Sequence, residues 1–135
     1  MNLKRKVQNI KKNYSIGIIG GGQLALMLTE AANNRGIKVC VQTKSSSDPA
    51  CSKADYVIEE DPLKVKGNKD LIKECEKIIF ENEWINIEKL NLIDSNNIFV
   101  PSLESIQPLV DRISQKILIE KMNLPLPRWI PLKEF

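Results

Sequence analysis

The sequence has no histidine, and its three cysteines are few and far apart. Without imidazole there is no histidine general base and no histidine ligand for a metal. Cys40, Cys51 and Cys75 form no C-x-x-C pair, which excludes the usual zinc and dithiol signatures. Cys40 falls inside a predicted strand, where a small core residue is expected. These absences predict no metal site and a reduced, cytoplasmic compartment.

Long apolar runs are absent too, which argues against a secretory signal or a membrane span. Positive charge is concentrated in residues 1–14, which hold five lysines and arginines and no acidic residue. The rest of the chain has 15 basic residues against 17 acidic ones and shows no basic cluster of the kind that binds nucleic acid. We therefore expect neither a membrane nor nucleic acid as a partner, and interpret residues 1–14 as a basic, solvated extension.

The most informative feature present is a run of three glycines between two apolar patterns. The apolar residues of segment 16–19 stop at Gly20, Gly21 and Gly22. A helical repeat follows at once, formed by Leu24, Met27, Leu28 and Ala31. Strand, glycine turn and helix open a βαβ unit, whose glycines let the backbone approach a ligand and whose helix start attracts anions.

The glycine loop also fits part of a dinucleotide fingerprint, with Gly20, Gly22 and Ala25 at the G-x-G-x-x-G/A positions. The fingerprint needs an acidic residue about 20 positions further on. Here the second predicted strand runs into Lys44, and Asp48 comes late. A lysine contact to an NADP phosphate and a purely structural turn remain alternatives, but we favour another ligand at this loop.

Strand and helix patterns alternate along the chain, which predicts a three-layer, Rossmann-like α/β domain with a mainly parallel sheet. We expect strands at 15–19, 38–42, 56–59, 77–80 and 97–100. We expect helices at 23–34, 68–75 (capped by Asn68), 86–92, from 103 (capped by Ser102) and 111–122. Gly36 and Asn123 stand where helices end in a left-handed conformation.

Ligands bind such sheets beyond the carboxyl ends of the strands, where the strand order reverses. The glycine loop follows the first strand, and Glu81 and Glu83 follow the strand at 77–80. If these two strands are neighbours, both groups line one crevice, which suits a cationic amine or a hydroxyl-rich ligand. The alternative is a solvated, inert charge cluster at a helix entry.

Several motifs together resemble the N5-carboxyaminoimidazole ribonucleotide synthetase family of the ATP-grasp superfamily. Gly-Gly-Gly-Gln-Leu at 20–24 resembles the opening of that family, and Phe-Glu-Asn-Glu at 80–83 resembles its glutamate-bearing strand end. Val-Pro-Ser at 100–102, Asp-Arg-Ile-Ser-Gln-Lys at 111–116 and Asn-Leu-Pro-Leu-Pro at 123–127 resemble the run into its ATP-grasp domain. The resemblance covers residues 16–129.

The resemblance implies a domain plan: a preATP-grasp domain at 15–102, then a helical linker at 103–135 toward an ATP-grasp domain expected beyond Trp129. In the complete enzyme, ATP and Mg²⁺ would activate bicarbonate to carboxylate 5-aminoimidazole ribonucleotide in purine synthesis, with a homodimer as the expected assembly. We expect the isolated chain to be inactive and to hold neither ATP nor Mg²⁺.

The resemblance also implies site residues, although it assigns none as catalytic. Arg112 and Lys116 would contribute to ATP binding. The substrate side would be formed by Gly20, Gly21, Gly22, Gln23, Leu24, Glu81 and Glu83. An alternative for Arg112 is a structural arginine paired with Asp111 or Glu120.

The chain departs from the family at two places. Ala25-Leu26-Met27 stands where Gly-Arg-Met is usual, and Thr43-Lys44 replaces the acid that usually begins the loop after the second strand. Alternatives are the preATP-grasp domain of another ATP-grasp carboxylase or transformylase, and a non-catalytic nucleotide-binding module. Relatives of the first kind usually have glutamate where Gln23 stands, which favours the synthetase.

Overall fold

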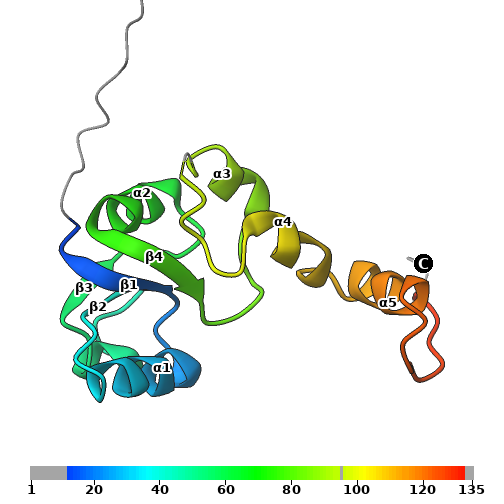
Figure 1. The fold of residues 1–135 in the computed structure, drawn as a ribbon, viewed down its shortest axis with the longest axis horizontal. Coiled ribbons are helices and arrows are strands. Elements are labelled where there is room, and N and C mark those ends of the chain that lie inside the picture. Colours follow the sequence, from blue (N-terminus) through cyan, green and yellow to red (C-terminus); the bar gives the residue numbers. More distant parts are fainter. Residues whose placement is uncertain (1–11, 95, 133–135) are drawn as a thin grey trace, which may run out of the picture.

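The computed structural model describes residues 12–94 and 96–132, and its centre is a four-stranded parallel sheet (Figure 1). The strands are β1 (Tyr14–Ile19), β2 (Val39–Thr43), β3 (Tyr56–Glu59) and β4 (Cys75–Phe80), in the order β3-β2-β1-β4. The predicted parallel α/β architecture is confirmed. Because the chain moves from β1 to β2 and β3 on one side and then to β4 on the other, the strand order reverses between β1 and β4.

Helices cover both faces of the sheet, as the apolar strands require. Helix α1 (Gln23–Asn33) and the 3-10 turn η1 (Pro49–Ser52) lie on one face, and α2 (Val65–Glu74) lies on the other (Figure 1). The core under α2 also includes residues of α3 (Ile87–Asn91) and α4 (Leu103–Ile106). Cys40 is fully buried in this core, as predicted, and a hydrogen bond with Cys75 is the first cause of its raised pKa.

Helix α1 forms where the glycine loop predicts it, but the apolar face marked by the sequence is the exposed one. Met27 is 63% exposed and Leu24 is 55% exposed. The residues buried against the sheet are small: Ala25, Thr29 and Ala32. Small side chains let the helix axis lie close to the strands, so the larger aliphatic groups point outward.

Two predicted elements of the second half differ in the structure. Helix α2 begins at Val65, three residues before the expected cap, and Asn68 is buried within it. Gly67 allows this, because a Cβ there would lie 2.6 Å from Gln42 Nε2. Segment 97–100 is not a fifth strand: it makes a single bridge, Ile78 to Phe99, and Asn97 has a φ of 49° that interrupts extended backbone.

The last segments extend away from the sheet (Figure 1). A short 3-10 turn, η2 (Gln107–Leu109), joins α4 to α5 (Arg112–Lys121), which buries none of its residues. Ser102 caps α4 as predicted, and Asp111 caps α5 by accepting a 2.7 Å hydrogen bond from Ser114 N. That bond is the main reason the pKa of Asp111 is lowered. Asn123 has the predicted positive φ, 53°.

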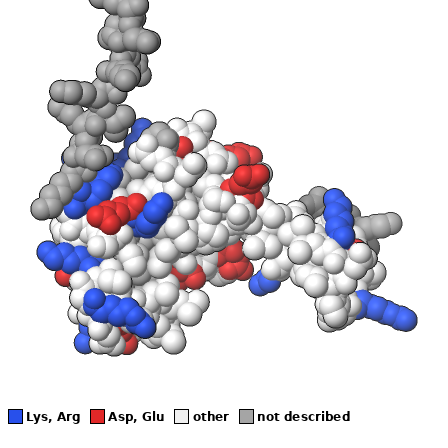
Figure 2. Space-filling model, in the orientation of Figure 1, with Lys and Arg blue, Asp and Glu red and all other residues white. Residues whose placement is uncertain are grey.

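Charges of both signs alternate over the face shown in Figure 2, with large uncharged areas between them. Among the helices of the described residues, none combines the length and the apolarity that a bilayer crossing needs. Of the predicted basic extension, residues 1–11 lie outside the described residues. Lys12 donates to the carbonyl of Ile72, and Asn13 N donates to Glu74 O at 3.0 Å, both on α2.

Candidate functional site

The glycine loop and Glu81 meet at the point where the strand order reverses. β1 and β4 are hydrogen-bonded neighbours, with Ile19 paired to Phe80. One residue beyond this pair, Glu81 N donates to Ile19 O at 3.0 Å. The Glu81 side chain then turns to the loop, where Gly22 N donates to Glu81 Oε2 at 2.9 Å. The predicted neighbourhood of the two strands is confirmed, and it brings Glu81 to the start of α1.

Glu81 explains why two of the three loop residues are glycine. A Cβ on Gly20 would lie 2.3 Å from Glu81 Oε2, and one on Gly22 would lie 2.2 Å from Oε1. Gly20 also has a φ of +113°, a backbone conformation that residues with a side chain rarely adopt. The carboxylate thus lies against the hollow that a pyrophosphate takes in the dinucleotide fold. Its negative charge there argues against binding of a nicotinamide dinucleotide.

The other side of the loop packs on the end of β2. A Cβ on Gly21 would lie 2.5 Å from Thr43 Oγ1, and Gly21 O accepts a 3.0 Å hydrogen bond from Ala50 N. Thr43 Oγ1 donates to the carboxylate of Asp48. Asp48, the acidic residue that comes late in the dinucleotide pattern, therefore helps to hold the glycine loop in place through Thr43. Glu81 faces the other side of the loop.

Gly22 occupies the N-cap position of α1, and it has no side chain that could cap the helix. Gln23 and Leu24, the two other predicted site residues of this loop, are exposed. Glu81 is the acid that faces this helix start, where negative charge is favoured by the helix dipole. The loop therefore presents a carboxylate, one exposed amide side chain and one exposed apolar side chain side by side.

Glu83, the second predicted carboxylate of the substrate side, pairs with Arg112 of α5. Arg112 Nη2 is 3.4 Å from Glu83 Oε1, and Arg112 Nη1 donates to Gln115 Oε1 at 3.0 Å. This partner differs from the two acids, Asp111 and Glu120, that the structural alternative named. Lys116, one turn further along α5, lies 5.9 Å from the ring of Trp129. The Glu83–Arg112 pair therefore connects the predicted substrate side with the predicted ATP side.

The Glu83–Arg112 pair is too exposed to be a stabilising device. The arginine side chain is 76% exposed and the glutamate 39%. We expect Arg112→Ala and Glu83→Gln each to change the free energy of unfolding by less than about 0.5 kcal/mol. Urea denaturation of both variants checks this, and a loss above about 1 kcal/mol would show that the pair holds α5 in place.

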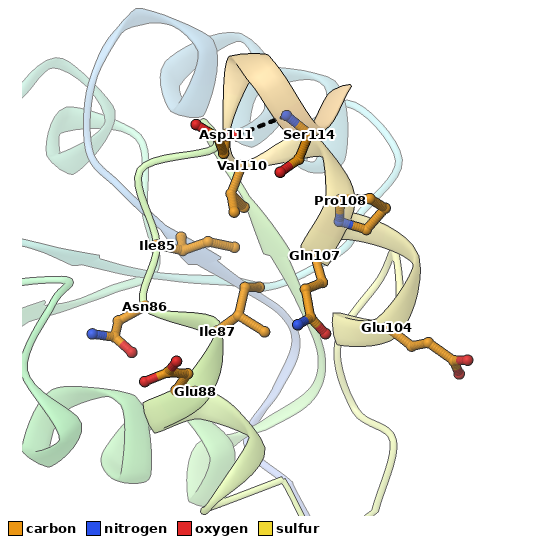
Figure 3. Close-up of a pocket in the computed structure, with 10 residues that line it drawn as sticks. All are labelled: Ile85, Asn86, Ile87, Glu88, Glu104, Gln107, Pro108, Val110, Asp111 and Ser114. Atoms are coloured by element: carbon orange, nitrogen blue, oxygen red, sulfur yellow. Dashed lines mark hydrogen bonds between the residues drawn. The ribbon is translucent and has the colours of Figure 1, made fainter. Parts of the chain in front are cut away.

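A groove of about 710 Å³ lies between α3 and the η2–α5 junction (Figure 3). Ile85, Ile87 and Val110 point into it, and Asp111 and Ser114 are joined across its upper edge. Of the predicted site residues, none lines it. Sequence reasoning missed this groove because two segments about 20 residues apart form it.

A smaller cavity of about 150 Å³ touches the glycine loop itself. We call it the switch-point cavity; its lining residues are Ile19, Gly20, Lys44, Asp61, Pro62, Leu63, Asn82 and Trp84. Lys44 Nζ is 3.4 Å from Asp61 Oδ2. The pKa of Asp61 is lowered, first by the hydrogen bond from Leu63 N and then by Lys44. Asp61 and Trp84 carry no motif that marks them in the sequence.

Comparison with protein families gives a match over residues 13–109 to the ribonucleotide synthetase preATP-grasp domain. The N5-carboxyaminoimidazole ribonucleotide synthase of Synechocystis sp. is 37% identical over 117 residues, which cover 86% of this chain and 30% of the relative. That of Synechococcus elongatus is 34% identical over 118 residues, covering 87% and 30%. The chain thus spans about a third of the length of these relatives.

Solved structures agree with the sequence comparison. The N5-carboxyaminoimidazole ribonucleotide synthetase of Thermotoga maritima has a TM-score of 0.76 at 30% identity, covering 85% of this chain and 32% of that one. The Staphylococcus aureus enzyme complexed with ADP has a TM-score of 0.76 at 31% identity, covering 84% and 31%. The Aspergillus clavatus enzyme, in complex with ADP and 5-aminoimidazole ribonucleotide, has a TM-score of 0.74 at 26% identity, covering 87% and 31%.

Proposed function

Because this chain belongs to the ribonucleotide synthetase preATP-grasp family, we propose that it supplies the substrate-side domain of a cytoplasmic, ATP-dependent ligase. The reaction is carboxylation of 5-aminoimidazole ribonucleotide with bicarbonate, in purine biosynthesis. The 37% identity to a curated synthase of that name is the observation that carries the proposal. The geometry of the glycine loop supports it independently.

The support from geometry lies in Glu81. Its Oε2 accepts the hydrogen bond from Gly22 N, which fixes the carboxylate at the helix start. Within residues 12–94 and 96–132 no second bond to this carboxylate is formed, so Oε1 is free to accept from a ligand. A carboxylate accepts only and favours hydroxyl or amine donors, and a ribonucleotide brings ribose hydroxyls. We propose that the glycine loop (Gly20, Gly21, Gly22), Gln23, Leu24 and Glu81 contact the ribose side of the substrate, and that Glu83, through its pair with Arg112, connects this side to the ATP side.

The ATP side is proposed for Arg112, with Lys116 next to it on α5. In this assignment residues 15–102 form the substrate domain and 103–135 lead to the ATP-grasp part. An exposed guanidinium suits bidentate contact with a phosphate. The described residues contain no group of three acidic or thiol side chains that could hold a metal ion. We propose that the Mg²⁺ that accompanies ATP is held by ligands from other parts of a homodimeric enzyme of full length, together with the phosphates of ATP.

A chimeric enzyme tests the proposal. The chain is joined to the part of the Synechocystis synthase that follows its matching region, and ADP release is measured with bicarbonate and 5-aminoimidazole ribonucleotide. We expect turnover that needs both substrates, and none from the 135-residue chain alone, since it spans only 30% of the relative. Arg112→Ala in the chimera should raise KM for ATP by roughly tenfold, as expected for loss of one charge-assisted contact.

The matched control is Arg128→Ala, which removes another arginine of the C-terminal segment. It should leave KM for ATP within a factor of about two. A folded chimera that releases ADP without dependence on 5-aminoimidazole ribonucleotide would contradict the proposed substrate. Turnover by the 135-residue chain alone would contradict the proposal that Arg112 and Lys116 need an ATP-grasp part to complete the ATP site.

A further inference from the structure

The switch-point cavity has a chemical character that the proposed ribose contact at Glu81 does not use. Its volume of about 150 Å³ is the volume of roughly five water molecules at about 30 Å³ each. This is enough for a ring system but too small for a whole nucleotide. Its wall combines large apolar side chains with one cation and one anion. Few convergent polar groups in an apolar wall are typical of ligand sites.

The charged groups of the cavity, Lys44 and Asp61, form a donor–acceptor pair. Asp61 Oδ1 accepts from Leu63 N at 2.9 Å, and Lys44 Nζ lies 3.4 Å from Oδ2. The backbone of Asp61 is anchored as well, because its carbonyl accepts a 3.2 Å hydrogen bond from Gln42 Nε2, on a side chain that is fully buried. The cavity wall therefore presents a donor and an acceptor side by side, and hydrogen bonds hold the acceptor in place.

The apolar part of the wall includes an indole that the fold leaves uncovered. Trp84 is 78% exposed and Leu63 is 45% exposed, although both line the same cavity. The Trp84 backbone is held in a turn, since its N–H donates to Asn82 Oδ1 at 2.9 Å. An exposed indole on a fixed turn offers a stacking surface, and heterocyclic bases stack on such surfaces whatever their identity.

We propose that the switch-point cavity is a binding subsite for a purine-type heterocycle, which stacks on Trp84 and pairs its polar edge with Lys44 and Asp61. An adenine ring matches this pair, since its ring nitrogen accepts from Lys44 and its amino group donates to Asp61. This site goes beyond the proposed function, because the side chains that would recognise the ring (Lys44, Asp61 and Trp84) are not among those of the ribose contact, and it needs no ATP-grasp partner.

Fluorescence of Trp84 tests the proposal directly. The chain has two tryptophans, so Trp129→Phe leaves Trp84 as the sole indole. Titration with adenosine should quench Trp84 with saturation and a dissociation constant on the order of 1 mM. Purine riboside, which lacks the amino group, should bind roughly tenfold more weakly. Ribose 5-phosphate, which has no ring, should leave the signal unchanged.

Matched lysine variants separate recognition from general charge. Lys44→Met and Asp61→Asn, each in the Trp129→Phe chain, should weaken adenosine binding roughly tenfold. Lys64→Met is the control, because Lys64 is as exposed as Lys44 (67%) and pairs with Glu60 but does not line the cavity. Circular dichroism confirms that each variant is folded.

Quenching that rises linearly without saturation, or that is equal in Lys44→Met and Lys64→Met, overturns the proposal. Equal binding of adenosine and purine riboside would also overturn it. None of these measurements requires turnover. Failure of the chimeric ligase therefore leaves this test intact, and failure of this test leaves the ligase proposal standing.

Discussion

Replacing Gly20 with alanine should lower the free energy of unfolding by about 3 kcal/mol, from backbone strain and crowding together. The backbone at Gly20 has a φ of +113°, and the new methyl group would lie 2.7 Å from Glu81 Cβ as well as 2.3 Å from its Oε2. Shortening Glu81 does not remove its Cβ. The double variant Gly20→Ala/Glu81→Ala should therefore be no more stable than Gly20→Ala. Urea denaturation followed by circular dichroism measures both.

Gly22 offers a matched comparison with the opposite outcome. Its φ is −77°, and the three atoms nearest to a methyl group there all belong to the carboxylate of Glu81, with Oε1 at 2.2 Å. Gly22→Ala should cost about 1–2 kcal/mol in the natural chain and about 0.5 kcal/mol or less in the Glu81→Ala background. Equal costs in the two backgrounds would show that Glu81 does not occupy the space beside the loop.

Glu81→Gln should lower kcat/KM for 5-aminoimidazole ribonucleotide about 100-fold in the chimeric enzyme, which corresponds to about 2.7 kcal/mol. The amide has nearly the shape of the acid and still accepts from Gly22 N, so the fold is kept. What is lost is the charge that strengthens a hydrogen bond from a substrate hydroxyl. Steady-state kinetics with varied 5-aminoimidazole ribonucleotide give the value.

Glu83→Gln is the control for this experiment, because it removes the same charge two residues away. Glu83 pairs with Arg112 at 3.4 Å, so its loss should act on KM for ATP and change kcat/KM for 5-aminoimidazole ribonucleotide by less than about threefold. If the two variants lose activity toward 5-aminoimidazole ribonucleotide equally, Glu81 does not bind the ribose hydroxyls, and the proposed contact is wrong.

The sequence predicted the parallel sheet from local rules, and it predicted that the glycine loop and Glu81 share one crevice on the condition that their two strands are neighbours. Apolar runs of β-branched residues form buried strands, and glycines end them. Because the strands are parallel, all of their carboxyl ends then lie at one edge of the sheet. The helix caps at Ser102 and the left-handed Asn123 are equally local, and both are confirmed.

The errors arose where burial depends on partners distant in the sequence. The aliphatic stripe of α1, with Met27 and Leu24, is exposed because small residues pack better against this sheet. Segment 97–100 has strand-like composition, but Asn97 turns the chain after one bridge to β4. Asn68 was expected at a helix start, and it lies buried because Gly67 lets α2 begin earlier beside Gln42.

The sequence by itself determined the class of fold, the family and the position of the glycine loop, since these follow from patterns within short segments. Only the tertiary structure decided that Glu81 lies against Gly20 and Gly22, that Glu83 turns to Arg112, and that Lys44, Asp61 and Trp84 line one cavity. The physical reason is that side-chain neighbours at a sheet edge come from loops about 20 residues or more apart. Their relative placement depends on how closely the helices pack on the two faces of the sheet. That packing depends on side chains from several segments, and no single segment encodes it.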